Sequence, residues 1–243
     1  MQDKLTDRAH WAEYWSNYKY EKVLSKTFYD KYLKPLKGSQ SFIEIGGFPG
    51  INSAYFYKNV CKDVTLLDFY VDKNIVLKLE QVNNIPQKSI TCIESDFFLF
   101  ETSKKYDIVF SMGFIEHFDD TKDVMERHIR LLSDKGNLLI ILPNLRGLNG
   151  LIQWLFDRKN LRIHNLESMK IKNLESIMKE SGMKSWTIDY TRKPMVWLEP
   201  KPGTRNAIGR KLVKCFSYFI KLFPIKGRFL SPYIIISAQK NPI

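Results

Sequence analysis

The chain has 243 residues, of which 44% are hydrophobic and 26% charged, so it can bury a substantial core and lacks the composition of a disordered protein. Its net charge of +12 is uneven, because 200–243 holds nine basic residues and no acidic one while 1–199 is nearly balanced. The polar N-terminus, three scattered cysteines and the lack of an apolar run of ~20 residues argue against secretion, disulfides and a membrane span, and favour a soluble cytoplasmic protein.

The first expected element is an N-terminal helical segment within 1–38. Aromatic residues recur at helical spacing near its start, and the pattern predicts a helix over roughly 8–36; they are Trp11, Tyr14, Trp15 and Tyr18. One aromatic face should pack on the domain that follows. Alternatively, a tyrosine of this face closes over a bound ligand.

Short apolar runs then alternate with helical stretches across 39–190, the expected core. The sequence predicts strands at 42–45, 64–67, 90–93, 106–110 and 137–142, and helices at 51–60, 71–82 and 121–132. Parallel neighbours need long crossovers, so this alternation predicts a Rossmann-like, doubly wound α/β sheet with helices on both faces.

The pattern becomes less regular after Pro143. It predicts helices near 151–156 and 166–178, a strand at 185–190, and a final strand at 232–238 within 231–243. Between the last two strands lies a basic stretch, 191–230, expected as an insert or lid. No boundary of a second domain is apparent, so 1–243 is expected to form a single domain.

The run Glu44-Ile45-Gly46-Gly47-Phe48-Pro49-Gly50 directly follows a predicted strand and precedes a predicted helix. Glycines at such a turn let the backbone approach a bound molecule closely. The next two strands end in Asp68 and Asp96, and Asp68 lies at the spacing of a carboxylate that binds ribose hydroxyls. Ligands of open α/β sheets bind outside the carboxyl ends of the strands, so the sequence predicts a nucleoside site at this edge.

These motifs, with Asp96-Phe97, the run from Asp107 to His117 and the approach to the fifth strand, resemble class I S-adenosylmethionine-dependent methyltransferases. The resemblance covers about 40–190. It implies a seven-stranded, mostly parallel sheet whose last strand is antiparallel, and S-adenosyl-L-methionine as the cofactor. The implied cofactor-binding residues are, for the methionine part, Glu44, Gly46, Gly47, Gly50, Ser111 and Met112, and, for the ribose and adenine, Asp68, Phe69, Asp96 and Phe97.

Two features qualify the resemblance. The family commonly has glycine where Phe48 stands, so this side chain must point away from the cofactor or the loop must take another path. The G-x-G-x-x-G fingerprint of NAD-binding enzymes is absent, and Glu44 suits an ammonium or sulfonium ligand better than a diphosphate.

The segment 114–118, after the fourth strand, is the expected place of acceptor chemistry. A histidine suits the removal of a hydroxyl proton, so His117 is the first candidate base and His164 the second; either could instead be a structural polar residue. Some methyltransferases of this fold bind a metal through Glu-x-x-Glu-His. Here the first position is Gly113, so no catalytic metal is expected.

The expected acceptor is a small molecule, a glycan or a lipid-linked saccharide, methylated at oxygen. The stretch 209–223 predicts a basic amphipathic helix, and 205–230 is therefore a candidate for contact with an anionic membrane, for a cap over the acceptor, or for simple packing. An RNA methyltransferase is an alternative, although nucleic-acid binding is not favoured because 1–199 is nearly balanced in charge. A further alternative is a methyltransferase-fold protein that binds a partner without catalysis. The oligomeric state does not follow from the sequence.

Overall fold

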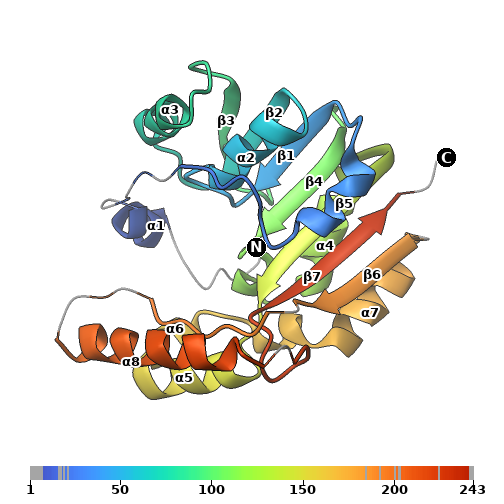
Figure 1. Ribbon diagram of the computed structural model, residues 1–243. Helices are drawn as coiled ribbons and strands as arrows, with labels where there is room; N and C mark the ends of the chain where they lie inside the picture. Colours follow the sequence, from blue (N-terminus) through green and yellow to red (C-terminus); the bar gives the residue numbers. More distant parts are fainter. Residues whose placement is uncertain are drawn as a thin grey trace.

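A seven-stranded sheet forms the centre of the computed structural model (Figure 1). The structure describes 8–15, 18, 20, 22–183, 185–191, 193–199, 201, 204–223 and 225–240, without the side chains of His10, Tyr14, Thr204 and Arg205. The side chain of Tyr14, expected on the aromatic helix face, and Arg192, near the start of the expected insert, therefore lie outside the described residues.

The strands confirm the predicted sheet. They are β1 (Ser41–Ile45), β2 (Asp63–Asp68), β3 (Ile90–Glu94), β4 (Tyr106–Met112), β5 (Leu132–Pro143), β6 (Ser185–Tyr190) and β7 (Tyr233–Gln239). Their order is β3-β2-β1-β4-β5-β7-β6. The neighbours from β3 to β5 pair in parallel, whereas β7 is antiparallel to both β5 and β6, as the resemblance implied.

Helices cover both faces of this sheet (Figure 1). On one face, α2 (Ile51–Asn59) and α3 (Lys73–Val82) pack on a core that includes Phe42 and Phe110. On the other face, α4 (Thr121–Arg130) and α7 (Ile171–Glu180) pack on a core that includes Ile43 and Val109. Successive side chains of a strand point to opposite faces, so β1 and β4 each contribute to both cores.

The N-terminal helix is shorter than predicted. Only α1 (Arg8–Trp15) is helical, and single 3₁₀ turns follow at Asp30–Tyr32 and Lys34–Leu36. Side-chain acceptors take backbone N–H groups that a continuing helix would use: Val23 N donates to Asn83 Oδ1 at 2.6 Å, and Thr27 N donates to Asp30 Oδ1 at 2.8 Å. Such local bonds compete with helix formation, which explains the difference.

A further group of helices lies at the end of the molecule toward which β5 points (Figure 1). It consists of α5 (Leu148–Phe156), α6 (Arg158–Arg162) and α8 (Thr204–Ile220). The helices α5 and α8 share a small core that includes Leu148, Ile152 and Val213. Helix α8 is the predicted basic helix. Along the chain it falls between β6 and β7, where the insert was expected.

Within the described part of the chain, none of the helices combines the length and hydropathy that a bilayer crossing requires.

Candidate functional site

The carboxyl ends of four parallel strands meet at one edge of the sheet. Ile45 pairs with Leu67 of β2 and with Ser111 of β4, and Asp68 pairs with Glu94 of β3. The residues that follow these strands are therefore neighbours. The expected glycine loop, Asp68 and Asp96 are gathered along a single rim.

The glycine loop turns sharply between β1 and α2. Gly46 has φ +65°, and a Cβ atom there would overlap the ring of Phe114. A Cβ atom at Gly47 would overlap the carboxyl group of Glu44. Side chains are therefore excluded by close contacts within the protein as well as by the backbone conformation at Gly46.

Glu44 lies beneath this loop. Its carboxylate is fully buried and accepts hydrogen bonds from Asn52 Nδ2 at 2.9 Å, Ser53 N at 2.8 Å and Ser53 Oγ at 2.5 Å. Burial raises the pKa of Glu44 to about 7, although these hydrogen bonds oppose the shift. In the structure its oxygens stabilise the start of α2 and support the loop from below. The expected contact of Glu44 with the methionine part of a cofactor stays a prediction.

Asp68 lies on the rim itself. Its Oδ2 accepts from Phe48 N at 2.9 Å and its Oδ1 from Tyr70 N at 3.1 Å. The backbone of Phe69 also bonds to this carboxylate, which has about four acceptor positions, so some acceptor capacity remains for a ligand. Burial raises the pKa of Asp68 to about 6, against the effect of the backbone hydrogen bonds.

The bulky side chain of Phe48 is accommodated in the core. Its side chain is buried and packs edge-on against Trp15 and Tyr70, at ring distances of 5.8 Å and 5.4 Å. The ring thus belongs to the core cluster on the α2 and α3 face. Only the Phe48 backbone N–H is presented to Asp68.

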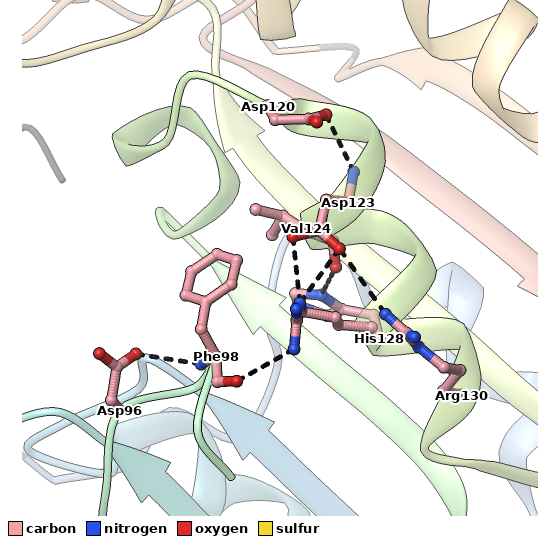
Figure 2. Close-up of polar contacts among 8 residues, drawn as sticks. Asp96, Phe98, Asp120, Asp123, Val124, His128 and Arg130 are labelled. Atoms are coloured by element: carbon pink, nitrogen blue, oxygen red, sulfur yellow. Dashed lines mark hydrogen bonds and ion pairs between the residues drawn. The ribbon is translucent and has the colours of Figure 1, made fainter. Parts of the chain in front are cut away.

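The segment after β3 is fixed by polar contacts. Figure 2 shows the carboxylate of Asp96 bonded to the backbone of Phe98, with Phe98 N donating to Asp96 Oδ1 at 3.0 Å. The carbonyl oxygen of Phe98 accepts from Arg127 Nη1 of α4 at 3.1 Å. The ring of Phe97 is only 7% exposed and packs against Phe114 and His128. This ring faces the core, and its expected contact with adenine stays a prediction.

Two expected residues come from the end of β4. Ser111 is fully buried, and its Oγ lies 3.1 Å from Nε2 of His128. Figure 2 shows the other contact of this imidazole, in which Nδ1 of His128 lies 2.8 Å from the carbonyl oxygen of Val124. Burial lowers the pKa of His128 to about 4, so this imidazole is neutral. Ser111 therefore bonds to α4, while Met112 and Phe69 are partly buried residues of the rim.

The two candidate bases, His117 and His164, lie side by side. Their ring centroids are 4.8 Å apart, and ligand atoms of Glu116, His117 and His164 all lie within 4.8 Å of one another. Glu116 is 1% exposed, and burial raises the pKa of its carboxyl group to about 8. Burial also lowers the pKa of His164. We call these three residues the Glu-His-His cluster.

Asn165, which sequence analysis missed, connects the two segments of the cluster. Its backbone N–H donates to the carbonyl oxygen of Glu116 at 2.7 Å. Its Nδ2 donates to the carbonyl oxygens of Phe118 at 2.9 Å and Asp119 at 3.0 Å. An Asn before a turn is a recognisable cap signal, but the sequence does not show which distant segment its amide binds.

Helix α1 lies across the rim. Trp11 packs edge-on against His117 at 5.4 Å, and Trp15 contacts Phe48. Arg8 Nη2 pairs with Glu94 Oε1 at 2.7 Å, and the Arg8 guanidinium lies over the ring of Tyr70. The aromatic face was expected to pack on the core. The contacts with the ends of all four strands were not predicted.

Comparison with known proteins agrees with this architecture. A family model described as a methyltransferase domain matches residues 14–188. A search of the curated proteins gave no match.

Several solved structures share the fold. A phosphoethanolamine N-methyltransferase 2 from Haemonchus contortus, in complex with phosphomonomethylethanolamine and S-adenosylhomocysteine, aligns with a TM-score of 0.61 at 17% identity, over 87% of this chain and 51% of that one. The chain thus spans about half the length of that enzyme. A SAM-dependent methyltransferase from Archaeoglobus fulgidus aligns with a TM-score of 0.56 at 15% identity, over 87% of this chain and 91% of that one. The plantazolicin methyltransferase BpumL, in complex with a pentazolic desmethylPZN analog and SAH, aligns with a TM-score of 0.55 at 16% identity, over 88% of this chain and 82% of that one.

The family model covers most of the chain, the sheet has the expected seven strands with the last one antiparallel, and the acidic and glycine residues lie at its carboxyl edge. The chain belongs to the methyltransferase-domain family, and it shares its fold with S-adenosylmethionine-dependent methyltransferases.

Proposed function

We propose that this enzyme transfers the methyl group of S-adenosylmethionine to a hydroxyl oxygen of a small molecule or saccharide, carried on a lipid. The observation that carries the proposal is the meeting of His117 and His164 beside the glycine loop. Phe114, whose ring lies against Gly46, is followed directly by the 3₁₀ turn Ile115–His117. The Glu-His-His cluster therefore lies next to the expected methionine position.

The rim fits S-adenosylmethionine in charge and shape. Asp68 retains acceptor capacity for a ribose hydroxyl, and the loop 46–50 offers backbone without side chains at Gly46 and Gly47. The buried carboxyl group of Glu44 lies directly beneath this loop and favours a positively charged group above it. Asp96 is positioned for the adenine side, next to the loop fixed by Phe98.

When bound, S-adenosylmethionine supplies a methyl group on a positively charged sulfur, and its displacement leaves a neutral thioether. The protein has to align the acceptor oxygen with the methyl carbon and to accept the hydroxyl proton. His117 Nδ1 lies 3.2 Å from the carbonyl oxygen of Ile163. That contact favours a proton on Nδ1, which makes Nε2 the basic atom. His164 stands beside it as the second candidate.

The acceptor experiment uses the full chain, S-adenosylmethionine with a labelled methyl group, and saccharide, polyprenyl-saccharide and amine acceptors. We expect label on an ether oxygen, and His117→Gln should lower kcat by about 10²–10⁴-fold while the cofactor Kd stays unchanged. Lys172→Gln, on an exposed position of α7, is the control. Label on amines alone, or on none of the hydroxyl acceptors, would contradict the proposal.

The exposed surface of α8 motivates the lipid. Ile208, Leu212 and Phe219 are 59%, 62% and 56% exposed, and their spacing aligns them along one side of the helix. Arg210 and Lys214, also exposed, fall on another side. Exposed apolar residues continue on the neighbouring α5, namely Leu151, Trp154 and Leu155. A helix with separate apolar and basic sides is typical of binding to an anionic membrane surface, and so many exposed apolar side chains favour lipid over RNA.

Membrane contact is tested by sedimentation with phosphatidylglycerol and phosphatidylcholine vesicles. We expect binding to the anionic vesicles, and replacing both Leu212 and Phe219 by Ser should weaken it at least tenfold. Lys214→Gln should weaken it by about fivefold, because each basic residue near the surface contributes about 1 kcal/mol. Equal binding of the double variant, or salt-sensitive binding to RNA instead of vesicles, would refute the membrane contact.

A further inference from the structure

The Glu-His-His cluster has the donor set of a metal centre. It brings one carboxylate and two imidazoles together from two segments that are distant in the sequence, and all three ligand atoms lie within 4.8 Å of one another. Two histidines and one carboxylate occur together in zinc and non-haem iron sites, where they leave coordination positions for water or substrate.

Both imidazoles are held by backbone oxygens. His117 Nδ1 lies 3.2 Å from the carbonyl oxygen of Ile163, and His164 Nδ1 lies 2.7 Å from that of Asn160. Nδ1–H groups that donate to these carbonyls leave the lone pair of each ring on Nε2. Metal-binding histidines almost always have such a partner on the other nitrogen, because it fixes the tautomer and the ring orientation.

Glu116 gives a second, independent indication. Its Oε2 is one of two buried side-chain oxygens without a hydrogen-bond partner in the described part of the chain. The other belongs to Asp157, whose Oδ1 pairs with Lys201 Nζ at 2.6 Å. Native proteins rarely leave a buried carboxylate oxygen without a partner, and a bound ion is one of the explanations for such a group.

The frame around the cluster is rigid. Asn165 bonds to the backbone of Glu116 and Phe118, so the segment that carries His164 is fixed to the one that carries His117. Trp11 packs edge-on against the His117 ring. Ligands held in this way lose little conformational entropy when they bind an ion.

We propose that Glu116, His117 and His164 bind one divalent transition-metal ion, with Zn²⁺ as the best match to two nitrogen ligands and one oxygen ligand. The proposal departs from the expectation of no metal, which counted ligands along one segment and stopped at Gly113. The spacing along the chain gave no reason to add His164. Binding of the ion does not depend on the proposed function. The role of the ion does depend on the proposed function. The ion would replace His117 in activating the acceptor hydroxyl, because it would lower the pKa of that hydroxyl group.

The test is a calorimetric titration of the untagged, metal-stripped full chain with Zn²⁺, with Co²⁺ absorption as a second readout. We expect one ion per chain and an increase in Tm on binding. Glu116→Gln preserves the shape of the buried side chain, and His164→Gln removes one imidazole. Each should raise the Zn²⁺ Kd by about 100-fold or more. Glu167→Gln is the control, because its side chain is exposed and outside the cluster.

Absence of stoichiometric Zn²⁺ binding, or an equal Kd in Glu116→Gln, His164→Gln and Glu167→Gln, would overturn the metal site. If a variant does not fold, the Tm increase and the Co²⁺ spectrum of the unmodified chain decide, and a spectrum without nitrogen ligation would also overturn it. The outcomes separate the two proposals. Transfer to hydroxyl acceptors that persists after chelation retains the proposed function and removes the ion's role. Zn²⁺ binding without transfer to any hydroxyl would retain the metal site and contradict the proposed function.

Discussion

Asn165→Ala tests whether His164 belongs to the acceptor site or only packs beside it. The change removes three side-chain hydrogen bonds: from Nδ2 to the carbonyl oxygens of Phe118 and Asp119, at 2.9 and 3.0 Å, and to Oδ1 from Glu167 N, at 2.9 Å. At about 1 kcal/mol each, the loss is about 3 kcal/mol. For a chain of this size such a loss lowers Tm by about 6–12 °C.

The change should also release the segment that carries His164. We therefore expect kcat for methyl transfer to fall more than tenfold, while the Kd of S-adenosylmethionine stays within about twofold, because the lost bonds lie on the acceptor side of the rim. A misplacement of about 1 Å in a catalytic constellation has effects of this size. Thermal unfolding, calorimetry and transfer of labelled methyl groups measure the three quantities separately.

Two further variants separate positioning from stability. Asn165→Asp keeps the acceptor for Glu167 N but loses both donors, so it should reproduce the loss of kcat with a smaller loss of Tm. Asn173→Ala also removes an amide that donates to Glu167, at 3.2 Å, and should leave kcat unchanged. The reasoning is refuted if Asn165→Ala retains full kcat, or if Asn173→Ala lowers kcat equally.

Three more predictions concern groups on the rim and beneath it. Ribose binding needs the charged form of Asp68, whose pKa burial raises to about 6, so affinity for S-adenosylmethionine should fall as pH drops below 6 and level off above 7; calorimetry between pH 5 and 8 would show a flat profile if this is wrong. Ser111→Ala leaves Nε2 of buried His128 without its partner and should cost about 1–3 kcal/mol in unfolding free energy, with cofactor affinity unchanged; a large loss of affinity would instead place Ser111 in the methionine pocket. The pKa of Glu44 is about 7 in the folded chain against an ordinary value of 4.5, so the folded state holds this proton to higher pH and stability should fall as pH rises between those values; Glu44→Gln should flatten that part of a denaturation profile, and an unchanged slope would argue against it.

The alternation of strands and helices was predictable because each buried strand is a short apolar run bounded by turns. The edge of the sheet was predictable too, since parallel strands end on the same side and Gly46, Asp68 and Asp96 each follow one. The length of α1 could not be predicted. The acceptors that compete with the helix are Asn83, through a tertiary contact, and Asp30, through a local turn, and a helical period reveals neither.

Side-chain direction limited the site predictions. In β1, Glu44 shares a face with Phe42 and points toward α2, and in β4, Ser111 shares a face with Val109 and points toward α4. The alternation itself can be read from the sequence, but which helix covers each face cannot. The meeting of His117 and His164 depends on the fold-back of the segment before α7, for which the sequence gives no spacing rule.

The most direct test of the central claim is calorimetric binding of S-adenosylmethionine to the full chain and to variants at the two ends of β2. We expect one cofactor per chain and, for Asp68→Ala, a Kd raised at least about 10-fold, because a hydrogen bond to a charged group is lost at about 1.5–3 kcal/mol. Asp63→Ala, at the opposite end of the same strand where the side chain pairs with Lys104, should bind as the unmodified chain does. No measurable binding by the unmodified chain, or an equal loss in both variants, would contradict the cofactor site on this rim.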